Sequence, residues 1–438
     1  MSTREEAGHV VVIGAGQAGH QTAASLREYG HSGRITLIGD EGVLPYERPP
    51  LSKAYLKGEA DESRLWLRPE TFYERHAIER VTGTALAVDR AARTVRLDDG
   101  TVHRYGHLVL ATGARPRALP VPGSGLRGVR TLRTLADAET LKKDLAGAAH
   151  VVVVGAGFIG LEFAAAAHDL GHEATVVEAL GRPLARVASA PTAEHFTRLH
   201  ERHGNELLFG QGIARFHGDS DGADDGDGAG EGRVAAVELT DGRRLPADLV
   251  LVGVGVTPCT ELAEAAGLRV AGGIVTDSRL LTSDPHISAV GDCAAFPHAR
   301  SGRHLRLESV QNAVDHGRLV ADRLTGTTRT YDDLPWFWST QFTTTLQIAG
   351  LGHDHDTQVV LGGDPGNSGA FSVLLFRGDD LLAVESVNRP ADHMAARRIL
   401  GSGIPLTRRE ASAAGFTLKG HLKEHLGARS GRPVPVTV

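Results

Sequence analysis

The sequence predicts an α/β protein in which two similar strand–turn–helix–strand units precede a smaller α+β domain. An apolar run at residues 10–13 leads into the glycine-rich turn 14–19, and the same pattern returns at residues 151–154 and 155–160. From about Tyr331 the composition changes, because tryptophans cluster there and strand-like stretches alternate with turns. A chain of 438 residues is also too long for one ordinary core, which favours two or three domains.

The first unit predicts a Rossmann-like site for a dinucleotide. Gly14 lets the chain turn sharply off the strand, Gly16 lets bare backbone approach a pyrophosphate, and Gly19 lets helix and strand pack closely. The helix expected over residues 20–29 then presents its free N–H groups to the phosphates. A glycine turn alone is weak evidence. Here a strand pattern precedes it and a helix and a further strand, 34–38, follow it, which is the context that the motif requires.

Polar residues after this unit are candidates for the same ligand. An acidic residue at the end of the second strand binds the adenosine ribose hydroxyls, and here Gly39 ends the strand with Asp40 and Glu41 directly behind it. We expect Asp40 to take that role. Arg48 and Lys53 flank two adjacent prolines and bring cations back towards the phosphates and the ring, although two basic residues also suit a solvated face.

Two later strands are expected to end beside the same cofactor. A buried strand at 107–110 runs into a small-residue turn, which lets the backbone pass close to a ligand. The residues of that turn are Ala111, Thr112 and Gly113. A strand at 287–290 ends in Gly291 and Asp292, and Asp292 is suited to bind the ribityl hydroxyls of a flavin. The helix expected from about Glu308 offers its N-terminus to the ring or the pyrophosphate.

The second unit is a cleaner copy of the first. Its turn contains Gly155, Gly157, Ile159 and Gly160. A helix is expected at 161–170 and a strand at 174–177, with Glu178 at the strand end, where its carboxylate accepts hydrogen bonds from the 2′- and 3′-hydroxyls of a ribose. That carboxylate repels a 2′-phosphate, and the nearest arginine is Arg182, so the cofactor predicted here is NAD(H). One dinucleotide is expected to stay bound and the other to come and go.

The remaining stretches carry weaker signals. Residues 217–232 are acidic and of low complexity, and we expect a disordered hairpin loop. A third buried strand, 249–256, contains Gly255, a further candidate for the cofactor site. The stretches 371–376 and 381–387 alternate across Gly378 as a hairpin does. The His-Asp-His-Asp run at 353–356 resembles a metal site, but a solvated loop explains it better because no third ligand cluster accompanies it.

Composition and charge exclude several function classes. A net charge of −6 gives no reason to expect nucleic-acid or anionic-membrane binding. Two distant cysteines, Cys259 and Cys293, exclude a disulfide framework and a CxxC redox pair, and they fit a reducing compartment. No apolar run is long enough to span a bilayer, and the polar first residues do not form a signal peptide, so we expect a cytoplasmic protein. The oligomeric state, monomer or dimer, is left open.

With these pieces the chain resembles the NADH-dependent ferredoxin reductases of oxygenase systems, the putidaredoxin and rhodocoxin reductase type of the glutathione-reductase-like flavoproteins. The resemblance covers nearly the whole chain in the same order. Its motifs are residues 14–19, 48–53, 108–113, 132–135, 155–162, 290–293, 308–313, 335–339 and 387–390.

The resemblance implies roles for particular residues. It implies that Ala18, Asp40, Lys53, Ala85, Arg133, Asp292 and Val310 contact FAD. Lys53 and Glu162 are implied to form an ion pair near the flavin N5, on the face where the nicotinamide stacks. Trp338 is implied to lie near the flavin on the side of the electron acceptor. The implied catalytic residues are Lys53, Glu162 and Trp338.

The resemblance also implies the domains and the reaction. We expect residues 1–117 and 250–330 to form an FAD-binding domain, 118–249 an NAD(H)-binding domain and 331–438 a C-terminal α+β domain. NADH is expected to pass a hydride to FAD, after which the electrons leave singly to a small iron–sulfur ferredoxin that feeds an oxygenase. Surface cations are expected to attract an acidic ferredoxin, although the net negative charge opposes this at long range. They are Arg48, Lys53, Lys57, Arg303 and Arg306.

Two other functions remain open. Thr340 replaces an aspartate of the family, and Thr343-Thr344-Thr345 replaces a stretch that commonly carries a lysine, near the expected mouth of the flavin site. These changes make direct reduction of a small molecule or oxygen an alternative. A redox-gated binding protein, as in the related apoptosis-inducing factor, is the other. A disulfide reductase is disfavoured because Cys259 and Cys293 cannot supply an adjacent pair.

Overall fold

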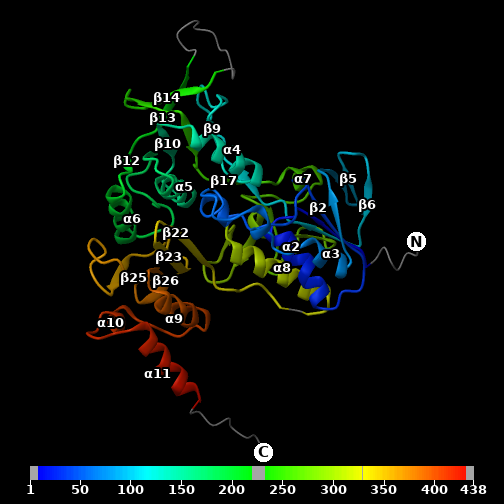
Figure 1. The fold of residues 1–438 in the computed structure, drawn as a ribbon. Helices are drawn as coiled ribbons and strands as arrows, with labels where there is room; N and C mark the ends of the chain where they lie inside the picture. Colours follow the sequence, from blue (N-terminus) through cyan, green and yellow to red (C-terminus); the bar gives the residue numbers. More distant parts are fainter. Residues whose placement is uncertain (1–7, 220–231, 328, 431–438) are drawn as a thin grey trace, which may run out of the picture. The chain divides into compact units, whose positions relative to one another are not determined.

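The computed structural model describes residues 8–219, 232–327 and 329–430, which form two compact units (Figure 1). The first unit comprises Met1–Leu51, Gly58–Arg117 and Val256–Asp333, and the second comprises Ser52–Lys57, Ala118–Gly255 and Leu334–Val438. The short segment Ser52–Lys57 therefore belongs to the second unit although both of its flanks belong to the first.

A five-stranded parallel sheet forms the centre of the first unit, in the order β19-β7-β1-β2-β3. Its strands are β1 (Val10–Ile13), β2 (Ile35–Gly39), β3 (Ile78–Thr82), β7 (His107–Leu110) and β19 (Ile287–Ala289). The central strand β1 is an unbroken, fully buried apolar run because both faces of the sheet are covered. Val10 and Val12 pack with helices α2 (Gln17–Glu28) and α8 (Val310–Leu324). Val11 and Ile13 face the opposite side, where they pack with strands β4 (Ala85–Asp89) and β5 (Thr94–Leu97) and helix α7 (Glu261–Ala265).

Helices α2 and α8 lie side by side in the first unit (Figure 1). A methyl group at Gly317 of α8 would lie only 2.8 Å from the backbone nitrogen of Thr22, so glycine permits this close approach. The other elements of the unit are α3 (Glu70–Arg75), β4 (Ala85–Asp89), β5 (Thr94–Leu97), β6 (Val102–Arg104), β8 (Ala114–Pro116), β17 (Val256–Pro258), α7 (Glu261–Ala265), β18 (Ile274–Val275), β20 (Ala294–His298) and β21 (Arg303–Leu305).

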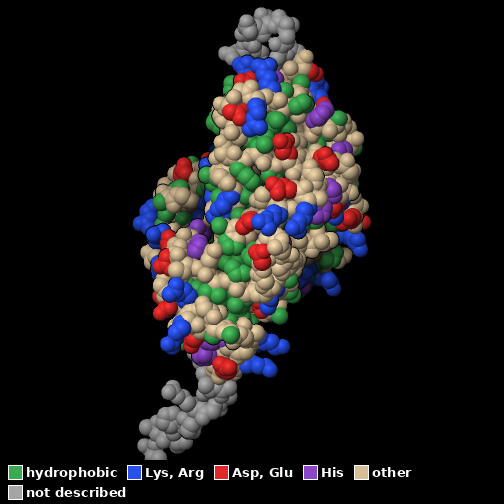
Figure 2. All heavy atoms as spheres, turned by 90° about the vertical axis from the view of Figure 1, so that its left-hand side faces the viewer, with side chains coloured by type: hydrophobic (Ala, Val, Ile, Leu, Met, Phe, Trp, Pro, Cys, Tyr) green, Lys and Arg blue, Asp and Glu red, His purple; other side chains and the backbone are tan. Residues whose placement is uncertain are grey.

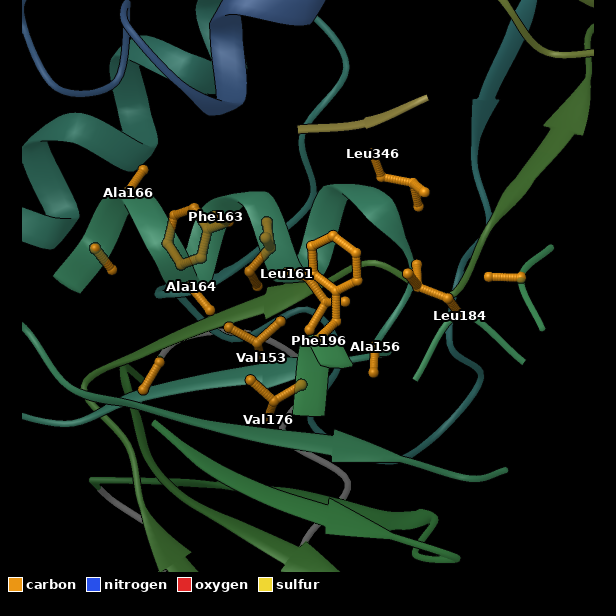
Figure 3. Packing of buried hydrophobic residues seen from close by; sticks show 14 of the residues in the cluster. Val153, Ala156, Leu161, Phe163, Ala164, Ala166, Val176, Leu184, Phe196 and Leu346 are labelled. Atoms are coloured by element: carbon orange, nitrogen blue, oxygen red, sulfur yellow. The ribbon is translucent and has the colours of Figure 1, made fainter. Parts of the chain in front are cut away.

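The second unit contains another five-stranded parallel sheet, in the order β12-β11-β10-β16-β9. Its strands are β9 (Val129–Arg130), β10 (Val151–Val154), β11 (Ala174–Glu178), β12 (Glu206–Phe209) and β16 (Leu249–Val252). The helices around it are α4 (Leu135–Ala146), α5 (Phe158–Asp169) and α6 (Ala190–Arg202). On one face Val153 and Val176 pack with Leu161, Phe163 and Phe196 of α5 and α6 (Figure 3). On the other face the sheet packs on β13 (Ile213–Gly218), β14 (Val234–Leu239) and β15 (Arg244–Pro246).

The C-terminal part of the second unit is an antiparallel sheet covered on one face by helices. The strand order is β22-β23-β26-β25-β24. The strands are β22 (Trp336–Gln341), β23 (Thr344–Gly350), β24 (Thr357–Leu361), β25 (Phe371–Arg377) and β26 (Asp380–Val387), and the helices are α9 (Pro390–Gly401), α10 (Arg408–Ala411) and α11 (Leu418–Ser430). Leu346 of this sheet joins the core of the parallel sheet (Figure 3), whereas Leu374 and Phe376 pack against α9 to α11. The predicted α/β class with two parallel sheets and a C-terminal α+β part is confirmed.

Two local expectations need correction. The stretch 249–256 is not one strand, because β16 ends at Val252 and β17, in another sheet, begins at Val256. Gly255 between them has φ +104°, which a strand cannot accommodate. In the acidic stretch 217–232, His217 and Gly218 end strand β13, which pairs antiparallel with β14, while residues 220–231 lie outside the described residues.

Candidate functional site

The first glycine turn is shaped by close backbone contacts. Gly14 has φ +105°, and a methyl group there would lie 2.1 Å from the carbonyl oxygen of Ala111. A methyl group at Gly19 would lie 1.9 Å from the oxygen of Gly14, so helix α2 packs directly on the turn. Space remains in front of Gly16, where a methyl group would meet no described atom within 4 Å. Gly16 also caps α2 without a side-chain hydrogen bond to the first-turn N–H groups, which suits an anion at this helix end.

The small-residue turn after β7 lies against this glycine turn. Ala111 donates its backbone N–H to the oxygen of Ile13 at 2.7 Å. Thr112 donates its hydroxyl to the carbonyl of Cys259 at 2.6 Å, and Cys259 donates its N–H to Gly113 at 3.0 Å. Ala111, Thr112 and Gly113 are thus brought to the edge of the sheet where Gly14 lies.

Gly291 and Ala18 are also neighbours. A methyl group at Gly291, whose φ is +73°, would lie 2.9 Å from the Cβ of Ala18. The backbone N–H of Gly291 donates to Nδ1 of His316 at 3.1 Å. His316 is fully buried in α8, and burial lowers its pKa to about 3, so it holds this turn as a neutral acceptor. Sequence reasoning missed His316, because nothing in a helical stretch marks one histidine as a partner of a distant turn.

The acidic residues after β2 separate into two environments. Asp40 is exposed. Glu41 accepts hydrogen bonds from Arg48 and from the Tyr46 hydroxyl, both at 2.5 Å. Burial lowers the pKa of the Arg48 guanidinium, but Tyr46, Glu41 and Asp292 outweigh that effect and raise its pKa. The structure thus brings Glu41, Arg48 and Asp292 into one electrostatic cluster.

The second glycine turn repeats the geometry of the first. Gly155 has φ +103°, and a methyl group there would lie 2.5 Å from the oxygen of Gly253. A methyl group at Gly160 would lie 2.1 Å from the oxygen of Gly155, whereas one at Gly157 would meet no described atom within 4 Å. Gly157 caps α5 without a side-chain hydrogen bond, and the apolar side chain of Ile159 in the first turn is 42% exposed.

Glu178 lies directly beside this second turn. Its Oε2 accepts the backbone N–H of Ala156 and its Oε1 accepts that of Leu180, each at 2.8 Å. Arg182 donates to the backbone carbonyls of Ala185 and Ala188, so its guanidinium is already engaged. The turn therefore presents a carboxylate, and the nearest arginine in the sequence is held by the loop that follows.

The predicted ion pair between Lys53 and Glu162 is present. Lys53 Nζ lies 2.5 Å from Glu162 Oε2, and the Glu162 side chain is only 3% exposed. Ser52 donates its hydroxyl to Oε2 at 2.6 Å and Ser339 donates to Oε1 at 2.7 Å. Sequence reasoning did not assign Ser52 or Ser339, although both stand in motifs that carry the family resemblance.

Trp338 lies on the opposite face of β22 from Ser339. Its register partner is Gln347, and Trp336 pairs with Ala349, which packs towards α9. The Trp336 ring lies 5.6 Å from that of Trp338, and the guanidinium of Arg397 lies 4.3 Å above the Trp336 ring. The structure therefore does not bring Trp338 together with Lys53 and Glu162.

The other predicted residues are more scattered. Ala85 begins β4 in the first unit, and Gly255 lies in the loop after β16. Arg133 donates its backbone N–H to Asp137 at 2.9 Å, just before α4. Val310 is the first residue of α8, whose cap is Ser309, so this helix begins two residues after the predicted Glu308.

The expected set of attracting cations is largely neutralised. Arg48 pairs with Glu41, Lys53 with Glu162, Lys57 with Asp169 and Arg306 with Glu308. The face shown in Figure 2 likewise has basic and acidic side chains interspersed. These residues therefore do not provide a field of uncompensated positive charge.

Several other features of the described residues bear on the chemistry. Within the described ranges, no group of three or more His, Cys, Asp and Glu side chains is placed to hold a metal ion. His355 of the His-Asp run contacts the carbonyl of Gly352 at 2.7 Å. Cys259 and Cys293 are free, and burial raises the pKa of the Cys293 thiol. None of the helices in the part of the chain that the structure describes is long and apolar enough to cross a membrane.

Comparison with known proteins gives two family matches that together cover most of the chain. Residues 8–317 match the family described as pyridine nucleotide-disulphide oxidoreductase, and residues 336–422 match the reductase C-terminal domain. Rhodocoxin reductase from Rhodococcus erythropolis is 48% identical over 417 residues, which is 95% of either chain.

Solved structures agree with this. The crystal structure of a ferredoxin reductase from Rhodopseudomonas palustris has a TM-score of 0.89 at 47% identity, covering 94% of this chain and 99% of that one. The covalent complex of putidaredoxin reductase with putidaredoxin has a TM-score of 0.90 at 38% identity, covering 97% of this chain and 99% of that one.

Proposed function

The chain belongs to the pyridine nucleotide-disulphide oxidoreductase family and is an NAD(H)-dependent flavoenzyme, and from this premise we propose that it reduces a small iron–sulfur ferredoxin. The observation that carries the proposal is that the chain holds two open glycine turns and an ion pair between Lys53 and the buried carboxylate of Glu162. The likeness to a reductase solved in complex with its iron–sulfur partner supports the choice of acceptor.

The residues present fit two dinucleotides. At Gly16 and Gly157 a Cβ would enter open space, so these positions leave room for pyrophosphate beside helix ends whose N–H groups lack side-chain caps. We assign FAD to the first turn, with Gly14, Gly16, Ala18, Gly19 and the cluster of Glu41, Arg48 and Asp292, and we keep Asp40, Ala85, Arg133, Glu308 and Val310 as further contacts. We assign NADH to the second turn, with Gly155, Gly157, Ile159, Gly160, Gly255 and Glu178.

FAD, when bound, supplies the chemistry, because it accepts a hydride from NADH and can release the two electrons one at a time. Lys53 and Glu162 are proposed to face the ring as a fixed ion pair. Glu162 accepts from Ser52, Lys53 and Ser339, so three donors fix its carboxylate, and the carboxylate in turn holds the Lys53 ammonium in one place. Trp338, on the other face of β22, is proposed to lie towards the acceptor.

The choice of NADH over NADPH rests on Glu178. Its carboxylate is oriented by Ala156 and Leu180, so it presents fixed acceptors for ribose hydroxyls and repels a phosphate. We further infer that the protein works in the cytoplasm, which its two free cysteines support. We also propose domain boundaries at 1–117 with 250–330, 118–249 and 331–438.

Anaerobic stopped-flow absorbance tests this function. The purified holoprotein is mixed with NADH and then with a panel of ferredoxins. We expect fast bleaching of the flavin band and fast reoxidation by at least one ferredoxin. Fast bleaching that no ferredoxin reverses would instead indicate a small-molecule acceptor or a redox-gated binding protein, and these two differ in steady-state turnover with oxygen and quinones. Absence of bleaching by NADH would overturn the assignment of the second turn.

A pair of variants locates the hydride step. Lys53→Met should slow bleaching while FAD stays bound, because it removes the cation from Glu162. Lys142→Met is the matched control, since the Lys142 ammonium lies over the Tyr55 ring, 5.5 Å from its centre. Equal bleaching rates in both variants would remove Lys53 from the site.

A further inference from the structure

A continuous chain of buried hydrogen bonds runs from Glu162 away from Lys53. Ser339, which donates to Glu162, lies 3.3 Å from Nε2 of Gln341, and Oε1 of Gln341 lies 2.9 Å from Nε2 of His200. Nδ1 of His200 lies 3.2 Å from Nδ2 of Asn205. All of these side chains are at most 3% exposed, so solvent does not compete for their protons.

The far end of this hydrogen-bond chain, at Ala174, fixes the direction of every hydrogen bond in it. The backbone N–H of Ala174 can only donate, and it points at Oδ1 of Asn205 at 3.0 Å. Asn205 must therefore turn its amide donor towards His200, whose Nδ1 becomes an acceptor. His200 consequently carries its proton on Nε2 and donates it to Oε1 of Gln341.

The same logic continues to the carboxylate. With its oxygen occupied by His200, Gln341 turns its amide donor towards the oxygen of Ser339. Ser339 has one proton, and since its oxygen now accepts a bond, that proton is left for Oε1 of Glu162. Burial lowers the pKa of His200 to about 4, so the ring stays neutral near pH 7 and the direction holds.

We propose that Asn205, His200 and Gln341 are positioning residues that orient the Ser339 hydroxyl towards Glu162 and so hold the Glu162 carboxylate as a fixed acceptor for Lys53. The chain connects strand β11 and helix α6 with strand β22 of the C-terminal domain, which gives that domain a part in arranging the proposed hydride site. This inference rests on the proposed function of Lys53 and Glu162.

A substitution at Gln341 removes one donor from the hydrogen-bond chain and keeps the size of the side chain. The carboxylate of Gln341→Glu still accepts from His200 but cannot donate to Ser339, so it competes with Glu162 for the one hydroxyl proton. Ser339→Ala removes that proton altogether. Ser372→Ala is the matched control, because Ser372 is an equally buried serine of the same sheet that contacts Asp392 and Ser386 instead.

The functional readout is the NADH concentration dependence of flavin bleaching in the holoenzyme. We expect the limiting bleaching rate to fall about tenfold in Gln341→Glu and Ser339→Ala, the scale of one hydrogen bond to a charged group, while the half-saturating NADH concentration stays within about twofold. Ser372→Ala should bleach as fast as the wild type. Equal limiting rates in Ser339→Ala and Ser372→Ala would overturn the proposal.

The tautomer of His200 gives a readout that is independent of activity. In wild-type holoenzyme carrying 15N-labelled histidine, NMR should show a ring with protonated Nε2 and bare Nδ1 whose signals move in Gln341→Glu. A His200 ring protonated on Nδ1 would overturn the direction even if the variants are unstable. If NADH fails to bleach the wild-type flavin while this tautomer is found, the proposed function is wrong, but the proposed direction of the hydrogen bonds is still supported.

Discussion

Replacing Glu178 with arginine should weaken NADH binding about a hundredfold and improve the use of NADPH. A carboxylate has about four acceptor sites, and in Glu178 the N–H groups of Ala156 and Leu180 occupy one on each oxygen. Two sites remain for the two ribose hydroxyls. A hydrogen bond to a charged group contributes about 1.5–3 kcal/mol, so loss of two costs at least about 3 kcal/mol, and each ~1.4 kcal/mol is a factor of ten. The new guanidinium can pair with a 2′-phosphate.

The assay is anaerobic flavin bleaching at varied NADH and NADPH, with FAD content and thermal midpoint measured for each protein. Glu178→Gln should weaken NADH about tenfold, because the amide nitrogen cannot accept from a backbone N–H. The control is Glu206→Gln, an acid on the neighbouring strand β12 whose carboxylate accepts from the hydroxyl of Thr175 at 3.3 Å. If Glu178→Arg keeps its FAD and binds NADH within twofold of the wild type, Glu178 does not hold the ribose.

Two further changes test other parts of the structure. Gly14→Val should abolish FAD binding, because its Cβ would clash with the Ala111 carbonyl at 2.1 Å and its φ of +105° is strained; a yellow protein with full FAD would show that the phosphate turn is misplaced. Burial and the nearby Asp333 raise the pKa of Asp315 to about 6, so the folded state binds this proton more tightly than the unfolded chain. The resulting stability is present below about pH 4 and is lost as the pH rises through 6. Asp315→Asn should therefore raise the urea midpoint relative to wild type at pH 8 but not at pH 4. Equal midpoints at pH 8 would contradict this.

The glycine turns were predictable because their geometry is local. Gly14 and Gly155 follow apolar strands within a few residues, and each closes against a neighbouring strand end as the motif requires. The carboxylate of Glu178 was likewise predictable from its place at the end of β11.

Contacts between distant parts of the chain were not predictable in this way. Ser52 and Ser339 are 110 and 177 residues from Glu162 in the sequence, and only the resemblance pointed to the Lys53 pair. The break of strand 249–256 was missed because an apolar run with two glycines reads equally well as one strand or two. The neutralised cations were missed because a sequence shows charges but not their partners.

The membership of Ser52–Lys57 in the second unit limits how this enzyme can be divided or recombined. The segment is secured there by Lys53 on Glu162, Lys57 on Asp169 at 3.0 Å and Leu56 in the core. A gene fragment that encodes residues 118–249 alone would lack Lys53, Ser52 and Ser339, the donors that hold the Glu162 carboxylate. We therefore expect that residues 118–249 do not reproduce this arrangement by themselves, and that an exchange of this stretch between relatives must carry residues 52–57 with it.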